Sequence, residues 1–217
     1  MEWQQLIYPA LFAIGFSGFT FVICAIWEFE NDRKMKNQRQ QETSELATWR
    51  QKLGHRILKV IVLMNIIIYL AWQIPDMLDI LEHYFVSNPV KKTKSFLPLS
   101  MVLNSFSHEG YFHLLSNLYM LYRNGYEILK IMTPEQFLAF YLCASVMSDI
   151  LSNLFMSLTG QGLAEGLGAS GVLFAILGVL GTARSENRLW VKAFLCFETI
   201  SYDTKSFNLC FSFIMFH

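Results

Sequence analysis

Apolar residues gather in long, nearly continuous runs along this chain, separated by shorter polar segments. The runs cover residues 6–27, 57–74, about 109–129, about 136–158 and about 168–184. A helix that crosses the hydrocarbon layer of a membrane needs roughly 20 mostly apolar residues, so these runs have lengths near that of a membrane span. The pattern therefore predicts an all-α protein, a polytopic transmembrane helical bundle.

The segments between the runs predict the organisation of the chain. The first run lacks the basic start and small-residue cleavage site of a signal peptide, so we expect it to remain as a span. Pro75 predicts a helix boundary, and residues 75–107 predict an interfacial loop with one short helix. The expected parts are an N-terminal span (1–27), a polar linker that is solvated or an exposed helix (28–56), a membrane core (57–200) and a tail (201–217).

Composition supports the membrane interpretation and removes other classes. Apolar residues make up 53% of the chain and charged residues 16%, and the formal net charge is zero. A neutral chain offers no basic excess for nucleic acid, so the expected surroundings are the lipid bilayer and other membrane proteins. The four cysteines lie far apart without a Cys-x-x-Cys pair, and we predict neither a metal nor a cofactor.

The first candidate for chemistry is the sequence Gly168-Ala-Ser170-Gly171 at the start of the last apolar run. Glycines on both sides of a serine permit a tight helix entry and let another part of the backbone approach closely. A serine in that setting can be exposed to a reacting group. The simpler interpretation is that Ser170 is one of the small residues with which membrane helices pack.

The second candidate is the pair His113 and Asn117 on an earlier run. Residues four apart lie on one face of a helix, so both side chains can point at one atom. Polar side chains inside a membrane are unfavourable without a partner or a function. Together with the backbone N–H of Ser170, an imidazole N–H and an amide N–H can surround the oxyanion of a tetrahedral intermediate. Alternatively, the two side chains simply bond to each other or to nearby carbonyls.

The pair His113-x-x-x-Asn117 followed by Gly168-x-Ser170-Gly171 resembles the rhomboid intramembrane serine proteases. Four further stretches resemble the mitochondrial presenilin-associated rhomboid-like branch; they are residues 84–89, 105–108, 136–141 and 166–171. One extra span before the core also resembles that branch. The resemblance covers about residues 57–194. The resemblance implies a serine endopeptidase of the mitochondrial inner membrane that cleaves membrane-anchored protein substrates. Ser170 would be the nucleophile, with His113 and Asn117 stabilising the oxyanion.

The general base departs from that pattern. A serine hydroxyl needs a base to take its proton, and rhomboids use a histidine from the last core helix. The five histidines here are His55, His83, His108, His113 and His217. Only His217 follows Ser170, so we expect the C-terminal core helix to be missing or replaced, and the core to be incomplete through truncation. A chain without its base should be nearly inert.

Two further functions stay open. A truncated or inactive rhomboid would bind transmembrane clients without cleaving them, which agrees with the missing base. A small transporter would use His113, Asn117 and Asp149 to line a polar path, although this leaves the Gly-x-Ser-Gly sequence unexplained. For Asp149, with Asn153 one turn later, we favour a position facing the interior of the bundle.

Overall fold

The structure is a computed structural model that describes residues 4–37, 43–87, 98–108, 110–159 and 168–183. Every element of regular secondary structure in these residues is a helix, which confirms the all-α prediction. The chain divides into two compact units, residues 1–173 and 174–217, and the first contains α1–α6 and the start of α7. Of the second unit, the structure describes only residues 174–183, which continue the last helix.

The first apolar run forms most of α1 (Gln4–Asn37). At 1.5 Å per residue its 34 residues extend about 51 Å, well beyond a hydrocarbon layer of roughly 30 Å. Its polar last third belongs to the segment predicted as a linker, and α2 (Thr43–Ala71) begins inside the same segment. The described part of this segment is therefore helical.

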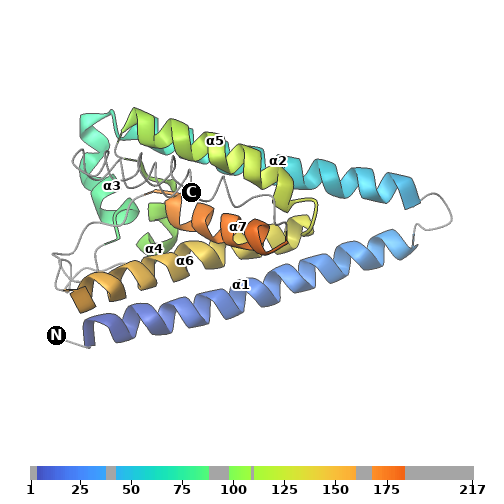
Figure 1. The fold of residues 1–217 in the computed structure, drawn as a ribbon, viewed down its shortest axis with the longest axis horizontal. Helices are drawn as coiled ribbons and strands as arrows, with labels where there is room; N and C mark the ends of the chain where they lie inside the picture. The colour runs from blue at the N-terminus through green and yellow to red at the C-terminus, as the bar shows by residue number, and fades with distance from the viewer. Residues whose placement is uncertain (1–3, 38–42, 88–97, 109, 160–167, 184–217) are drawn as a thin grey trace, which may run out of the picture. The chain divides into compact units, whose positions relative to one another are not determined.

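α1 lies along α6 (Pro134–Thr159) over much of its length (Figure 1). Polar contacts join the two helices near the start of α6. The buried Asn31 amide donates to Glu135 at 2.6 Å, and the Gln136 amide reaches the carboxylate of Glu28 at 3.2 Å. Arg50 of α2 forms an ion pair with Asp32. Lipid gives no hydrophobic driving force between helices, so such contacts fix the place of α1.

α2 packs closely on α5 (Tyr111–Ile128) through Gly125, which faces Leu58 of α2, and Gly54, which faces Leu129 just after the end of α5. A Cβ on Gly125 would lie 2.6 Å from a methyl carbon of Leu58, and one on Gly54 would lie 2.9 Å from a methyl carbon of Leu129. Leu58 is fully buried. Each glycine leaves room for one leucine, which is the usual way in which membrane helices approach each other.

Short helices connect α2 to α5, starting with η1 (Pro75–Met77) and α3 (Leu78–Phe85). The helix boundary at Pro75 and the short helix after it are confirmed. Two elements that the sequence did not predict follow, α4 (Ser100–Leu103) and η2 (Asn104–Phe106). The last helix of the described residues, α7 (Ser170–Ala183), begins at the serine itself.

Three of the described helices are long and apolar enough to cross a membrane, over residues 7–34, 48–71 and 134–155. They correspond to three of the predicted spans, and α7 is a shorter apolar helix. α5 is not among the three, because its 18 residues include Asn117, Arg123, Asn124 and Glu127. The end of the predicted core and the tail lie outside the described residues.

Replacing Gly125 tests the packing of α2 on α5. We expect Gly125→Leu to lower the free energy of unfolding by about 1–3 kcal/mol, because an extra side chain must enter space that Leu58 already fills. Combining it with Leu58→Ala should restore part of the loss. The control is Gly15→Leu, since nothing lies within 4 Å of that exposed position on α1. Denaturation in detergent micelles measures all four proteins, and equal stability of the two single glycine variants would contradict the packing.

Candidate functional site

Gly168 brings the start of α7 to the start of α5. Its φ of +109° is a backbone conformation that favours glycine, and its N–H donates to the Asn104 carbonyl at 3.0 Å. A Cβ at this position would lie 3.0 Å from Cε1 and 3.2 Å from Nε2 of His113. The backbone two residues before Ser170 therefore rests directly on the imidazole, an approach that only glycine permits.

Ser170 is half-buried and occupies the first turn of α7. The Leu173 N–H donates to the Ala169 carbonyl at 3.0 Å, which starts the helical bonding pattern. The N–H groups of Ser170, Gly171 and Val172 precede this bond, so the helix itself leaves them without an acceptor. The positive end of the helix dipole lies here as well, so this position can stabilise a developing negative charge.

Close packing against α6 explains why the pattern Gly168-x-Ser170-Gly171 has a glycine at position 171. A Cβ there would lie 2.3 Å from Oγ and 2.5 Å from Cβ of Ser148 on α6. In the structure, Gly171 therefore packs against α6. This contact seats the first turn of α7 on α6.

Asn117 lies one turn after His113 on α5 and is fully buried. Its amide nitrogen donates to the His113 carbonyl at 2.8 Å, while its Oδ1 is buried without a hydrogen-bond partner. The amide nitrogen carries two hydrogens, so one remains beyond the bond to the carbonyl. A buried polar atom without a partner costs about 1–3 kcal/mol and marks a place worth a functional explanation.

His108 lies beside His113, with ring centroids 5.1 Å apart and an edge-on angle of 71°. It is 2% exposed and therefore belongs to the buried surroundings of His113. Burial, with a smaller contribution from the nearby His113 and against an opposing effect of the Phe106 backbone, lowers the pKa of His108 to about 3. His108 is therefore neutral at physiological pH.

Sequence reasoning missed Asn104, whose carbonyl holds Gly168. Nothing in the local pattern of residues 98–108 distinguishes it, because its partners come from distant parts of the chain. The same segment is tied to the end of α2, where the Trp72 indole donates to the Ser107 hydroxyl at 2.9 Å. The predicted interior position of Asp149 is confirmed, since it is 5% exposed.

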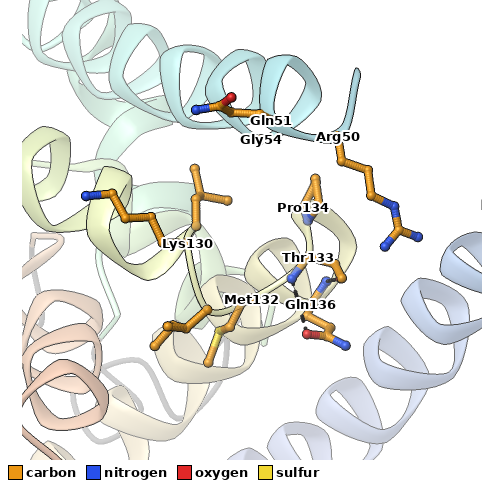
Figure 2. A pocket seen from close by; sticks show the side chains of 10 residues that line it. Arg50, Gln51, Gly54, Lys130, Met132, Thr133, Pro134 and Gln136 are labelled. Carbon is orange, nitrogen blue, oxygen red and sulfur yellow. Dashed lines mark hydrogen bonds between the residues drawn. The ribbon is translucent and has the colours of Figure 1, made fainter. Parts of the chain in front are cut away.

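A cavity of about 510 Å³ lies elsewhere, between α2 and the turn from α5 to α6. Figure 2 shows its two cations, Arg50 and Lys130, on opposite sides. Each is already paired, Arg50 with Asp32 and Lys130 with Glu127 at 2.5 Å. The cavity is at the far end of α5 from His113, about 24 Å along the helix, so it is separate from the candidate site.

The same view shows why α6 begins where it does. The Thr133 N–H donates to the Gln136 side chain at 3.2 Å, and the Gln136 N–H donates to the Thr133 hydroxyl at 3.3 Å (Figure 2). This reciprocal pair is a capping box that satisfies two N–H groups at the helix start. Among the described residues, no group of three or more His, Cys, Asp or Glu side chains is placed to hold a metal ion.

The fold and the site define a class, a polytopic helical membrane protein in which a glycine two residues before a serine lies against a histidine of another helix. Residues 98–216 match a family model described as the Rhomboid domain, which is more than half of the chain. The chain belongs to the rhomboid family, as the sequence pattern predicted. The match also includes residues after about 194, beyond the stretches that carried the resemblance.

Curated relatives agree with the mitochondrial branch. The "Presenilin-associated rhomboid-like protein, mitochondrial" of Homo sapiens is 31% identical over 205 residues, covering 86% of this chain and 53% of that protein. The Mus musculus protein of the same name is 32% identical over the same shares. "Rhomboid protein 1, mitochondrial" of Saccharomyces cerevisiae is 25% identical over 116 residues, covering 53% of this chain and 33% of that protein.

The chain spans about half the length of the presenilin-associated relatives it matches. Those relatives are named mitochondrial, and three described helices have the length of a membrane span. The chain is therefore an integral mitochondrial membrane protein, and this part of the predicted location is confirmed. Its assignment to the inner membrane stays a prediction.

Gly168→Ala tests the contact between residues 168–170, here called the serine loop, and His113. We expect a loss of about 1–3 kcal/mol in the free energy of unfolding, because the new methyl adds strain at positive φ and meets the imidazole. Gly110→Ala is the matched control, since its φ of −141° suits any residue and nothing lies within 4 Å. Denaturant titration in detergent gives both values, and equal losses would rule out a special role for Gly168.

The buried His108 makes stability depend on pH. An unfolded chain protonates this histidine near pH 6.5 and the folded protein only near pH 3, so folding becomes less favourable as pH falls between these values. The contribution is one proton, at most about 1.4 kcal/mol per pH unit. Unfolding of the wild type and His108→Gln from pH 7 to 4 should give a shallower slope for the variant. Parallel slopes would show that folding does not shift the pKa of His108.

Proposed function

We propose that this chain carries the nucleophile and the oxyanion-binding groups of a rhomboid-type intramembrane serine endopeptidase. Its substrates would be membrane-anchored proteins of the mitochondrion, cleaved within or near their spans. The observation that supports this most is the contact of Gly168 with the His113 imidazole, two residues before a serine at the start of a helix. This contact joins the two sequence patterns, which are more than 50 residues apart, at one place in the fold.

In this proposal the Ser170 hydroxyl attacks the carbonyl carbon of the scissile peptide bond. The carbonyl oxygen gains negative charge and accepts hydrogen bonds from the Ser170 N–H, the His113 imidazole and the second hydrogen of the Asn117 amide. The helix end adds a favourable field for the same charge. Donors of this kind act in surroundings of low dielectric constant, and each typically contributes on the order of 10²–10³ in rate.

The attack also requires a base for the hydroxyl proton and an acid for the leaving amine. In the sequence, His217 is the one histidine that follows Ser170, and it lies outside the described residues. His108 does not suit the role, because its pKa of about 3 makes it a very weak base. The base is therefore the group that an experiment must identify.

A second function follows because no histidine of the described residues has been identified as the base. Without a base, a rhomboid fold with an intact serine loop would hold transmembrane clients without cleaving them. The proposed site would then be a binding surface for extended or partly unwound membrane segments. The two functions differ in whether Ser170 reacts.

A fluorophosphonate probe, which forms a covalent bond with activated serines, distinguishes the two. In reconstituted membranes we expect labelling of the wild type and none of Ser170→Ala. His113→Gln and Asn117→Ala should lower the labelling rate on the order of 10²-fold, because each removes one oxyanion donor. Ser152→Ala is the control, since this exposed serine of α6 lies on another helix. A membrane-anchored model substrate should be cleaved by the same variants that are labelled.

His217→Ala completes the series. Loss of labelling in this variant identifies His217 as the base, and unchanged labelling means that another group takes the proton. No labelling of the wild type, with retained binding of a transmembrane segment, would reject the protease and support the client-binding function.

A further inference from the structure

One face of α6 contacts two segments next to the candidate site, α4 and the start of α7. Ser145, Ser148 and Asp149 share this face because they are three and four residues apart. The Ser145 hydroxyl lies 3.2 and 3.3 Å from two carbonyls of α4 and donates to them. Ser148 lies against Gly171 at the start of α7. The third residue, Asp149, has no part in the proposed reaction.

Asp149 accepts three side-chain hydrogen bonds in the interior of the bundle. The Ser87 hydroxyl donates at 2.6 Å, the Asn104 amide at 2.7 Å and the Asn153 amide at 3.3 Å. A buried carboxylate is strongly unfavourable without such bonds, so this arrangement must be maintained for the residue to be tolerated. Its partners come from the segment just after α3, from η2 and from α6 itself.

Asn104 continues this network toward the serine. Its side chain is held by Oδ1 of Asp149, and its backbone carbonyl accepts the N–H groups of Ser107 and Gly168, each at 3.0 Å. The side chain and the carbonyl belong to one residue at the start of a short 3-10 helix. Fixing the side chain therefore fixes the direction in which the carbonyl points.

We propose that Asp149 is a positioning residue for Ser170. Through Asn104 it fixes the carbonyl that holds Gly168 on His113, and so it sets the place at which α7 begins. Asp149 acts through the backbone and does not touch the substrate. The expected effect on the reactivity of Ser170 rests on the proposed protease function. The coupling of Asp149 to Gly168 through Asn104 does not.

Substitutions of Asp149 separate this role from simple burial. In Asp149→Asn, the remaining oxygen can still accept from Asn104, and the Ser87 hydroxyl can rotate to accept from the new amide. In Asp149→Leu no acceptor remains, and the Asn104 side chain is released. The matched control is Asn153→Leu, which removes another buried partner of Asp149 from α6 but leaves the bond to Asn104.

Amide hydrogen exchange of Gly168 in lipid bilayers measures the coupling without any catalysis. We expect Asp149→Leu to speed this exchange on the order of tenfold, the effect of losing about one net hydrogen bond. Asp149→Asn and Asn153→Leu should stay near the wild type. Asn104→Leu should match Asp149→Leu, and the double variant should add little, because both remove the same link.

The amide of Leu121, in the buried middle of α5, reports on the fold as a whole. Faster exchange at Gly168 with unchanged exchange at Leu121 supports the proposal. Equal acceleration at both amides, or unchanged exchange at Gly168 in Asp149→Leu, overturns it.

Labelling by the fluorophosphonate probe then tests the consequence for Ser170. If the wild type is labelled, Asp149→Leu should lower the maximal labelling rate about tenfold with little change in the probe concentration for half-maximal rate, and Asp149→Asn should restore it. A labelled wild type with an equally fast Asp149→Leu rejects the positioning role. An unlabelled wild type rejects the protease function, while the exchange result still decides the coupling.

Discussion

The hydrogen bond from the Gly168 N–H to the Asn104 carbonyl is the interaction on which the candidate site depends. It joins two segments that are 64 residues apart, and it places the backbone before Ser170 on the His113 imidazole. The bond requires a backbone with φ of +109°, which a residue with a side chain adopts only with strain. The conformation, the bond and the contact with His113 therefore form one constraint, and glycine is the residue that meets all three.

The surroundings of this bond follow from the lack of water in a membrane interior. Polar groups there must find partners within the protein, since an unsatisfied group costs several kcal/mol. α6 provides many of these partners, through Ser145 to α4, Asp149 to η2 and Glu135 to α1. α6 contributes no proposed catalytic residue, but its hydrogen bonds help to position α1, α4 and η2. Glycines complete the arrangement where helices meet, Gly125 against Leu58 and Gly171 against Ser148.

The sequence predicted the helical class and several spans, because apolar run length and helical spacing are local properties. The roles of Ser170, His113 and Asn117 stay predictions. The sequence also predicted that Asp149 faces inward. It did not predict α4 and η2 or the role of Asn104, whose importance comes from partners 45 and 64 residues away. It did not predict that Gly171 packs on Ser148 of α6, since a glycine on a helix does not show which helix it will meet. The end of the predicted core (to residue 200), the tail (201–217) and the base of the proposed reaction stay predictions.

The central claim is that the serine loop lies directly on the imidazole of His113. Solid-state NMR of the protein in lipid bilayers, with histidine and glycine isotope labels, tests this without any requirement for activity. The structure predicts a through-space correlation between Cε1 of His113 and Cα of Gly168, which disappears when His113 is replaced by glutamine. A spectrum with assigned signals for both residues but no such correlation would contradict the account.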